Sequence, residues 1–482
     1  MAAICFIWEE SEPATAKTGE DQRPGGPRHD VTFGIGSDAE TVIGPANVGE
    51  LTLDWTFDAA DNGGTLPFQS TPVIADGCVY VASGNTSGGG VFAINADTGD
   101  GVWTNRVDGG ILGLTVQDGR VYAGSYTTSF DLRAQALDQA TGAEVWRTER
   151  LTLEGRRQDG EVIHASPVVF DGMYFVAVSR GVGPDARPPL TFLDAATGAV
   201  LKRVVVVSED DHALGYSGAG AWSTAAVDTV NKVIYVATAD SEAFKTDHAY
   251  NNAILKIDAD KTSSTFGTVL GSYKGEGEHY LDGLNLYDQP ACEMFGDDRT
   301  GTSPSSSLTC AELDLDFGAS VNLFSGEGGR TVVGAMQKSG VYHAVYGDTM
   351  ERAWRVPLSA PSAAGNAGTS AVDAAGVYVS ANPSVIASLD RSTGSAQWIS
   401  SSMHDAIRYQ PMTVANGVVY TVTTTGVLIA FDAANGLPLW QRAMGADIGG
   451  PCTTQGGGVA VARNTVFAQC DDAGIVLAYR LT

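Results

Sequence analysis

Short alternations of apolar and polar residues recur along the chain, and residues that favour turns separate them. Residues 70–74 (STPVI) and 77–81 (GCVYV) are one such pair. Alternation with a period of two is typical of a strand that buries one face, and Gly and Asp between two such strands indicate a tight turn. The pattern therefore predicts an all-β protein built from short antiparallel strands.

One combination of turn and strands repeats with the form Ala-x-Asp-x-x-Thr-Gly-x-x-x-Trp. Asp bonds its own backbone in such a turn and Gly accepts a positive φ, so the unit is predicted to be a hairpin. Two copies, Phe192 to Lys202 and Lys256 to Phe266, keep the frame with a different last residue. Five copies keep the Trp ten residues after the first position, and they end at Trp103, Trp146, Trp354, Trp398 and Trp440.

Each hairpin follows another pair of predicted strands, which makes a four-stranded unit. Such a unit cannot bury both faces alone, so neighbouring units stack with the Trp as a wedge between them. The last unit, Val476 to Arg480, begins the pattern where the chain ends, whereas Trp55 stands in a strand without a preceding unit. The economical solution is that the N-terminal strand completes the C-terminal unit, because this removes an exposed sheet edge.

The sequence therefore predicts one eight-bladed β-propeller over residues 31–482, with Trp-docking repeats and a ring closed by the N-terminal strand. Residues 1–30, which are polar from residue 9 onwards, are expected to form a flexible lead-in. One long interval between repeats holds an insertion at about residues 272–315. We expect this insertion to lie over one face of the propeller as a functional loop.

The net charge of the chain limits the kinds of partner that it is expected to bind. The protein carries a net charge of −27 and has a pI of about 4.4. Such a surface repels phosphate groups, so neither nucleic acid nor an anionic membrane is expected as a partner. No apolar run reaches the length of about 18 residues that a transmembrane helix needs. The apolar residues 1–8 are few and have no basic flank, so they are a poor signal peptide.

Six cysteines are present, and Cys292 and Cys310 share a separation of 18 positions with Cys452 and Cys470. We predict two local disulfides, which would place the protein in an oxidising compartment, secreted or periplasmic. The alternative is four buried free thiols in a cytosolic protein. No CxxC or Cys/His grouping favours zinc, and no CxxCH is present to hold a fused c-type haem.

The repeats resemble those of pyrroloquinoline quinone (PQQ) dehydrogenases, above all the polyvinyl alcohol dehydrogenase type. The resemblance runs from about residue 38 onwards and is carried by residues 40–48, 217–223, 314–320 and 337–341. It implies a quinoprotein that oxidises an alcohol to a carbonyl with PQQ and Ca²⁺ at the axial mouth. The substrate would be a small-molecule or polymer alcohol, and a separate acceptor such as a cytochrome c would take the electrons.

The resemblance also assigns roles by position. Trp222 would be the floor on which the quinone stacks, and Lys338 would polarise the quinone carbonyl. Asp316 would take the alcohol proton as general base and contact the metal. Asp240 would be a further Ca²⁺ ligand, since calcium prefers hard oxygen ligands. Arg187 stands where the family has a cofactor-binding Arg.

The chain departs from the family pattern at several positions. The loop at residues 179–187 lacks the family's Glu metal ligand, and Asp185 is the carboxylate that would replace it. The family's vicinal cysteine pair is missing near this loop. A Trp that would face the channel in the sixth blade is replaced at residues 367–369.

These departures leave two other functions open beside the dehydrogenase. One is a propeller that has lost the quinone and binds or transforms another small molecule by non-redox chemistry. The other is a non-catalytic interaction scaffold. Each site residue also has a simpler interpretation: Trp222 as core packing, Asp316 as a turn cap and Lys338 as a solvated hairpin residue. The sequence does not rank the histidines that would assist non-redox chemistry, which are His164, His212, His279 and His404.

Overall fold

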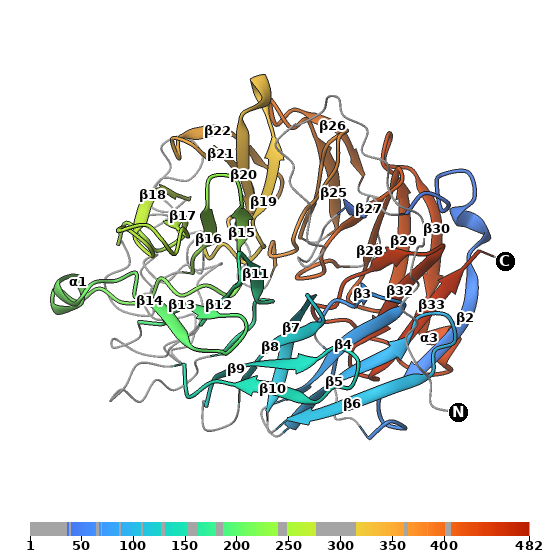
Figure 1. Cartoon of the computed structure of the whole chain (residues 1–482). Coiled ribbons are helices and arrows are strands. Elements are labelled where there is room, and N and C mark those ends of the chain that lie inside the picture. The colour runs from blue at the N-terminus through green and yellow to red at the C-terminus, as the bar shows by residue number, and fades with distance from the viewer. Residues whose placement is uncertain are drawn as a thin grey trace, which may run out of the picture.

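The computed structural model describes residues 36–37, 40–63, 67–68, 70–85, 88–107, 109–126, 131–151, 162–179, 187–239, 248–275, 315–360, 365–382, 384–400 and 406–481. Within these ranges the chain forms eight antiparallel sheets, which stand as blades around a central axis (Figure 1). The predicted all-β, eight-bladed propeller is therefore confirmed.

The blades are numbered from the first complete one in chain order, and each is given from its innermost to its outermost strand. Blade 1 consists of β3 (Val73–Ala75), β4 (Cys78–Asn85), β5 (Gly88–Asn95) and β6 (Gly101–Val107), and blade 2 of β7 (Gly110–Gln117), β8 (Arg120–Tyr126), β9 (Arg133–Asp138) and β10 (Glu144–Arg147). Blade 3 consists of β11 (Val168–Phe170), β12 (Met173–Ala177), β13 (Leu190–Asp194) and β14 (Val200–Val204), and blade 4 of β15 (Ala226–Asp228), β16 (Val233–Ala237), β17 (Ala253–Asp258) and β18 (Val269–Lys274). Blade 5 consists of β19 (Asn322–Ser325), β20 (Thr331–Met336), β21 (Val341–Tyr346) and β22 (Arg352–Pro357), and blade 6 of β23 (Ala371–Val372), β24 (Val377–Ala381), β25 (Val385–Leu389) and β26 (Ala396–Ser400). Blade 7 consists of β27 (Thr413–Ala415), β28 (Val418–Val422), β29 (Val427–Asp432) and β30 (Pro438–Ala443), and blade 8 of β31 (Ala460–Ala462), β32 (Thr465–Cys470), β33 (Ile475–Arg480) and β2 (Thr52–Asp58).

Burial falls from the middle of each blade to its rim. In blade 3, every residue of β12 is buried, whereas four of the five residues of the outermost strand β14 are exposed. Blades stack on both faces of the middle strands, so these strands are apolar at nearly every position and the period of two weakens there.

The tryptophans dock between blades, as predicted. Trp103 on β6 donates from Nε1 to the Gln139 carbonyl in the turn of the next blade, at 2.9 Å. Gly142 in that turn has a φ of +70°, and a Cβ there would lie 2.5 Å from the Trp103 ring. The Gly of the repeat is therefore required both for its backbone and for the room that it leaves. The same two contacts recur for Trp55, Trp146, Trp354 and Trp398.

Blade 4 departs from this rule. Lys256 pairs with Gly271, so Gly271 holds the Trp position and the alignment with Phe266 is wrong, because the turn before β18 is longer than in the other blades. The next blade carries Met350, with a φ of +60°, where the repeat has Gly. A Cβ on Gly271 would lie 3.0 Å from Met350 Cγ. A small residue on one blade is thus matched by a large residue on the next.

The ring closes through the N-terminal strand, as predicted. β2 pairs antiparallel with β33, and Trp55 lies opposite Ala478. Each innermost strand contacts the next one around the ring, and β31 contacts β3. A short strand that the sequence did not predict, β1 (Gly36–Ser37), pairs in parallel with β27 and gives blade 7 a fifth strand.

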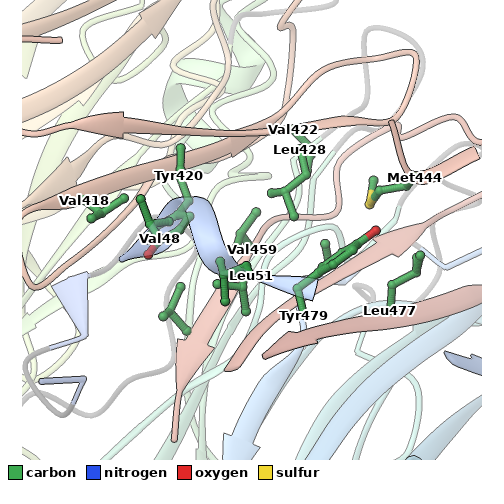
Figure 2. Packing of buried hydrophobic residues seen from close by; sticks show 14 of the residues in the cluster. Val48, Leu51, Val418, Tyr420, Val422, Leu428, Met444, Val459, Leu477 and Tyr479 are labelled. Carbon is green, nitrogen blue, oxygen red and sulfur yellow. The ribbon is translucent and has the colours of Figure 1, made fainter. Parts of the chain in front are cut away.

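Residues just before β2 seal blades 7 and 8. The short 3₁₀ helix η1 (Val48–Glu50) lies against β30. The outer partner of β33 is β2, which comes from much earlier in the sequence, so no hairpin turn joins these two strands. Val48 is buried with Leu51, Tyr420 and Tyr479 in one apolar cluster (Figure 2). The N-terminal segment therefore supplies packing that a turn supplies in the other blades.

The disulfide between Cys452 and Cys470 is confirmed, with a Cα–Cα distance of 5.0 Å. It ties the segment after α3 (Met444–Ile448) to the end of β32. Cys78 is also disulfide-bonded, which the two predicted pairs do not include. Cys292, Cys310, the lead-in at 1–30 and most of the 272–315 insertion lie outside the described residues. The helices in the described ranges are too short to span a bilayer.

Candidate functional site

Trp222, Asp316 and Lys338 stand at matching corners of blades 4 and 5. Trp222 precedes β15 and Asp316 precedes β19, while Lys338 lies in the turn between β20 and β21. In an antiparallel blade the first strand begins at the end where the second strand finishes. The topology therefore brings all three residues to one mouth of the propeller.

The three side chains contact one another. Trp222 Nε1 donates to Asp316 Oδ2 at 2.9 Å, and Lys338 Nζ lies 3.3 Å from the same oxygen. Lys338 Nζ also lies 5.0 Å from the centroid of the Trp222 ring. A single carboxylate oxygen thus receives an indole N–H and an ammonium group, while the cation faces the indole π system.

Burial decides between the competing interpretations of these residues. Asp316 is 8% exposed and Lys338 is 6% exposed. Lys338 is therefore not a solvated hairpin residue. The Asp316 carboxylate bonds to the two other side chains of the group, so capping a turn does not account for it. A buried ion pair costs desolvation energy and needs such additional hydrogen bonds to be tolerated.

Four further residues frame the Trp222 ring. A Cβ on Gly318 would lie 2.5 Å from Trp222 Cη2 and 2.6 Å from the Ala367 Cβ. His164 of blade 3 and Tyr409 of blade 7 approach the ring edge-on, with centroid distances of 6.3 and 6.2 Å. The Trp222 side chain is thus oriented by contacts from several blades.

The sequence interpretation missed Tyr409 and left His164 unranked. Both residues precede an innermost strand, as Trp222 and Asp316 do. That position relative to the repeat is the signal that would have found them. His164 is held in turn by Ser179, whose Oγ lies 2.7 Å from His164 Nδ1.

Other predicted residues do not join this group in the described chain. Arg187 donates from Nε to the Val207 carbonyl at 2.8 Å and pairs through Nη1 with Glu209 of α1 (Glu209–Ala213). His212 lies in α1 and bonds through Nδ1 to the Tyr216 carbonyl. The remaining candidates, which lie outside the described residues, are Asp185, Asp240, His279 and His404.

The residues present fit a planar anionic cofactor. An aromatic ring offers a stacking surface, and the Lys338 ammonium offers a positive charge beside it. Calcium needs about six to eight oxygen ligands. In the described ranges no group of three or more His, Cys, Asp or Glu is placed to hold a metal, and Asp316 is the one predicted ligand found there. The calcium site therefore remains a prediction.

Comparison with known proteins identifies the family. The model of the PQQ-repeat family described as outer membrane protein assembly factor BamB matches residues 52–237 and 301–482. The chain belongs to this PQQ-repeat family.

Relatives of this PQQ-repeat protein include several dehydrogenases. The polyvinylalcohol dehydrogenase of Sphingopyxis sp. (strain 113P3) is 26% identical over 451 residues, which cover 82% of this chain and 63% of the relative. The 1-butanol dehydrogenase (cytochrome c) of Thauera butanivorans is 32% identical over 123 residues, which cover 23% of this chain and 16% of the relative. The chain therefore spans less than two thirds of the length of these relatives.

A solved structure shares the fold. The quinohemoprotein alcohol dehydrogenase from Comamonas testosteroni superposes with a TM-score of 0.66 at 17% identity, covering 92% of this chain and 78% of that one. At this identity the match shows the eight-bladed architecture alone.

Proposed function

We propose that this PQQ-repeat protein binds PQQ at the mouth formed by Trp222, Asp316 and Lys338 and oxidises an alcohol to a carbonyl compound. The observation that carries the proposal is the contact of Asp316 with both of the other side chains. A scaffold has no need to desolvate a carboxylate and an ammonium group beside an indole ring. The names of the dehydrogenase relatives support the same chemistry.

Each residue of the site has a defined task in this proposal. When bound, the quinone supplies the two-electron acceptor for the hydride that leaves the alcohol carbon. Asp316 takes the hydroxyl proton, and its contacts with Trp222 and Lys338 fix the direction in which it accepts. Lys338 places a positive charge where the cofactor oxygen gains electron density. Trp222 gives the flat surface on which a planar ring stacks.

The proposal includes the remaining partners. The substrate is a small-molecule or polymer alcohol, and a separate carrier such as a cytochrome c takes the electrons. Ca²⁺ would be held by Asp316 with Asp185 and Asp240. Arg187 is left out of the cofactor site, because its guanidinium bonds to the Val207 carbonyl and to Glu209. The Cys452–Cys470 disulfide supports a secreted or periplasmic location, since disulfides persist in oxidising compartments.

Calorimetric titration with PQQ, with and without Ca²⁺, tests this proposal. We expect binding to the wild type, and a loss of binding in Trp222→Ala and Lys338→Met. Lys202→Met is the matched control, because Lys202 is exposed on the outermost strand of blade 3. Absence of binding at high micromolar PQQ under both conditions would overturn the proposal.

A second candidate is a propeller without quinone chemistry, which the missing Glu at residues 179–187 and the family's description as an assembly factor favour. Thermal-shift measurements with a panel of small alcohols and carboxylates distinguish a propeller that binds another small molecule from a non-catalytic scaffold. A ligand whose stabilisation disappears in Lys338→Met identifies a small-molecule site. If neither PQQ nor any member of the panel binds, the scaffold is favoured.

A further inference from the structure

A series of hydrogen-bonded side chains, buried except for its last member Tyr273, lies behind the Asp316–Lys338 pair. Gln337, the residue before Lys338, donates from Nε2 to the Leu315 carbonyl at 2.8 Å. Its Oε1 lies 3.0 Å from His343 Nε2, and His343 Nδ1 lies 3.1 Å from the Tyr273 hydroxyl. Gln337 and His343 have no exposed surface. These side-chain contacts link β21 in blade 5, which carries His343, to β18 in blade 4, which carries Tyr273.

One fixed acceptor sets the direction of every bond in this series. A carbonyl oxygen only accepts, so the Leu315 carbonyl requires the amide nitrogen of Gln337 to face it. The amide oxygen therefore faces His343, whose Nε2 must carry the proton. Neutral His343 then accepts at Nδ1, so the Tyr273 hydroxyl donates to it. The tautomer of His343 and the orientation of the Gln337 amide fix each other.

The surroundings keep His343 neutral and Gln337 in place. Burial, with Arg355 and Arg352 as smaller contributions, lowers the pKa of His343 to about 3. Phe317 packs edge-on against the His343 ring at a centroid distance of 5.3 Å. A Cβ on Gly275 would lie 2.7 Å from Gln337 Nε2, so this Gly lets the backbone of blade 4 close over the amide.

The amide of Gln337 is connected to both members of the proposed catalytic pair. It anchors the carbonyl of the residue before Asp316, and its own backbone leads directly into Lys338. A second tie runs from the Lys338 N–H to the Asp316 carbonyl at 2.9 Å. Because the amide spans the two segments, a change in its orientation moves Asp316 relative to Lys338.

We infer that Gln337 is a positioning residue for the Asp316–Lys338 pair, and that His343 and Tyr273 lock its amide in the working orientation. This inference deepens the proposed function, on which its catalytic readout rests. Supporting groups of this kind hold reacting residues in place, and their loss typically costs about 10-fold to 100-fold in activity.

Two variants test the inference without depending on catalysis. Gln337→Met keeps the length of the side chain and removes the three hydrogen bonds of the amide, to the Leu315 carbonyl, His343 and the Ser339 hydroxyl. Tyr273→Phe removes one hydroxyl from a half-buried side chain. The readout is the Trp222 indole N–H resonance in ¹⁵N-tryptophan-labelled protein, assigned by its loss in Trp222→Phe. This proton donates to Asp316, so it reports where the carboxylate lies. Thermal unfolding shows that each variant is folded.

We expect Gln337→Met to shift this resonance and Tyr273→Phe to shift it less. The control is Gln469→Met in blade 8, a buried Gln that donates to the Ser70 carbonyl at 2.7 Å and is expected to leave the resonance in place. In the active enzyme, Gln337→Met is expected to lower kcat about 10-fold to 100-fold with little change in KM. An unmoved Trp222 resonance in folded Gln337→Met and Tyr273→Phe would overturn the inference.

The two proposals fail separately. A shifted resonance in a protein that does not bind PQQ would leave the positioning role standing and remove the dehydrogenase. An unmoved resonance in a protein that binds PQQ would remove the positioning role of Gln337 and leave the proposed binding of PQQ standing.

Discussion

At the scale of single residues, equivalent turns of different blades bury different charges. Lys338 in blade 5 and Asp471 in blade 8 both lie between the second and third strands. Lys338 pairs with Asp316, whereas Asp471 accepts N–H groups from the backbone of residues 455–457 and from the Gln469 side chain. The equivalent turns thus hold a cation in an ion pair in one blade and a carboxylate bonded to N–H groups in the other.

Asp471 gives the protein a specific pH dependence. Burial raises the pKa of Asp471 from 3.8 to about 6, against the opposing effect of its hydrogen bonds. The folded state therefore holds this proton more tightly than the unfolded chain, so the free energy of unfolding falls as the pH rises from about 4 to about 6. We expect Asp471→Asn to remove roughly 3 kcal/mol of this fall, measured by urea unfolding at pH 4 and pH 7. Equal pH dependence in the two proteins would contradict the prediction.

Asp316→Asn separates binding from chemistry. The amide keeps the shape of the side chain but is a very weak base, so kcat is expected to drop about 100-fold to 10,000-fold. Affinity for PQQ, measured by calorimetry, is expected to change much less than kcat. A variant that retains full turnover would exclude Asp316 as the base.

At the scale of the hairpin, the repeat is a docking device between blades. The Trp at the end of one hairpin lies on the Gly of the next turn, and it donates to a carbonyl of that turn. This pairing explains why blade 4 and blade 5 change together, with Gly271 facing Met350.

Replacing Gly at a positive φ costs energy through the backbone and, where a side chain lies close, through a steric clash. Gly394 and Gly119 have nearly the same φ and allow these two costs to be measured separately. Gly394 has a φ of +71°, and a Cβ there would lie 2.5 Å from Trp354. Gly119 has a φ of +73° and nothing within 4 Å of such a Cβ. Gly119→Ala is expected to cost about 1–2 kcal/mol from the backbone alone. Gly394→Ala is expected to cost about 1–3 kcal/mol more, because the Trp ring must move. Urea unfolding measures both, and equal losses would contradict the docking role.

At the scale of the whole molecule, two strands that are far apart in the sequence, β2 and β33, share one blade. β2 completes blade 8, and the indole of Trp55 donates to the Ala96 carbonyl in blade 1. Closure through β2 brings blade 8 against blade 1, so in the described part of the chain every blade has a neighbour on each side.

The variants Trp55→Ala and Trp103→Ala test whether a Trp on the closing strand β2 contributes differently from a Trp that docks two consecutive blades. Each variant is expected to lose about 3–5 kcal/mol, because each empties a similar site. Hydrogen exchange is expected to differ: Trp55→Ala exposes the amides of β2 and β33, whereas Trp103→Ala exposes those at the boundary of blades 1 and 2. Unchanged protection of β2 and β33 in Trp55→Ala would contradict the closure role.

The sequence alone determined the fold, because each blade is a local unit whose turn residues and Trp lie within a few positions of one another. The eight blades and the Cys452–Cys470 disulfide follow from such local spacing. The closure by Trp55 follows instead from the incomplete last repeat, because β2 and β33 are far apart in the sequence. The sequence misplaced the docking position of blade 4, because a longer turn shifts the register from Phe266 to Gly271.

Only the tertiary structure decided how the residues at the mouth contact one another. Trp222 and Asp316 are 94 positions apart, and their hydrogen bond depends on how blades 4 and 5 turn about the axis. Tyr409 reaches Trp222 from blade 7, and no local pattern specifies that contact. Burial is likewise a property of the assembled ring: the sequence left open whether Lys338 contacts a cofactor or is solvated, and the stacked blades remove it from water.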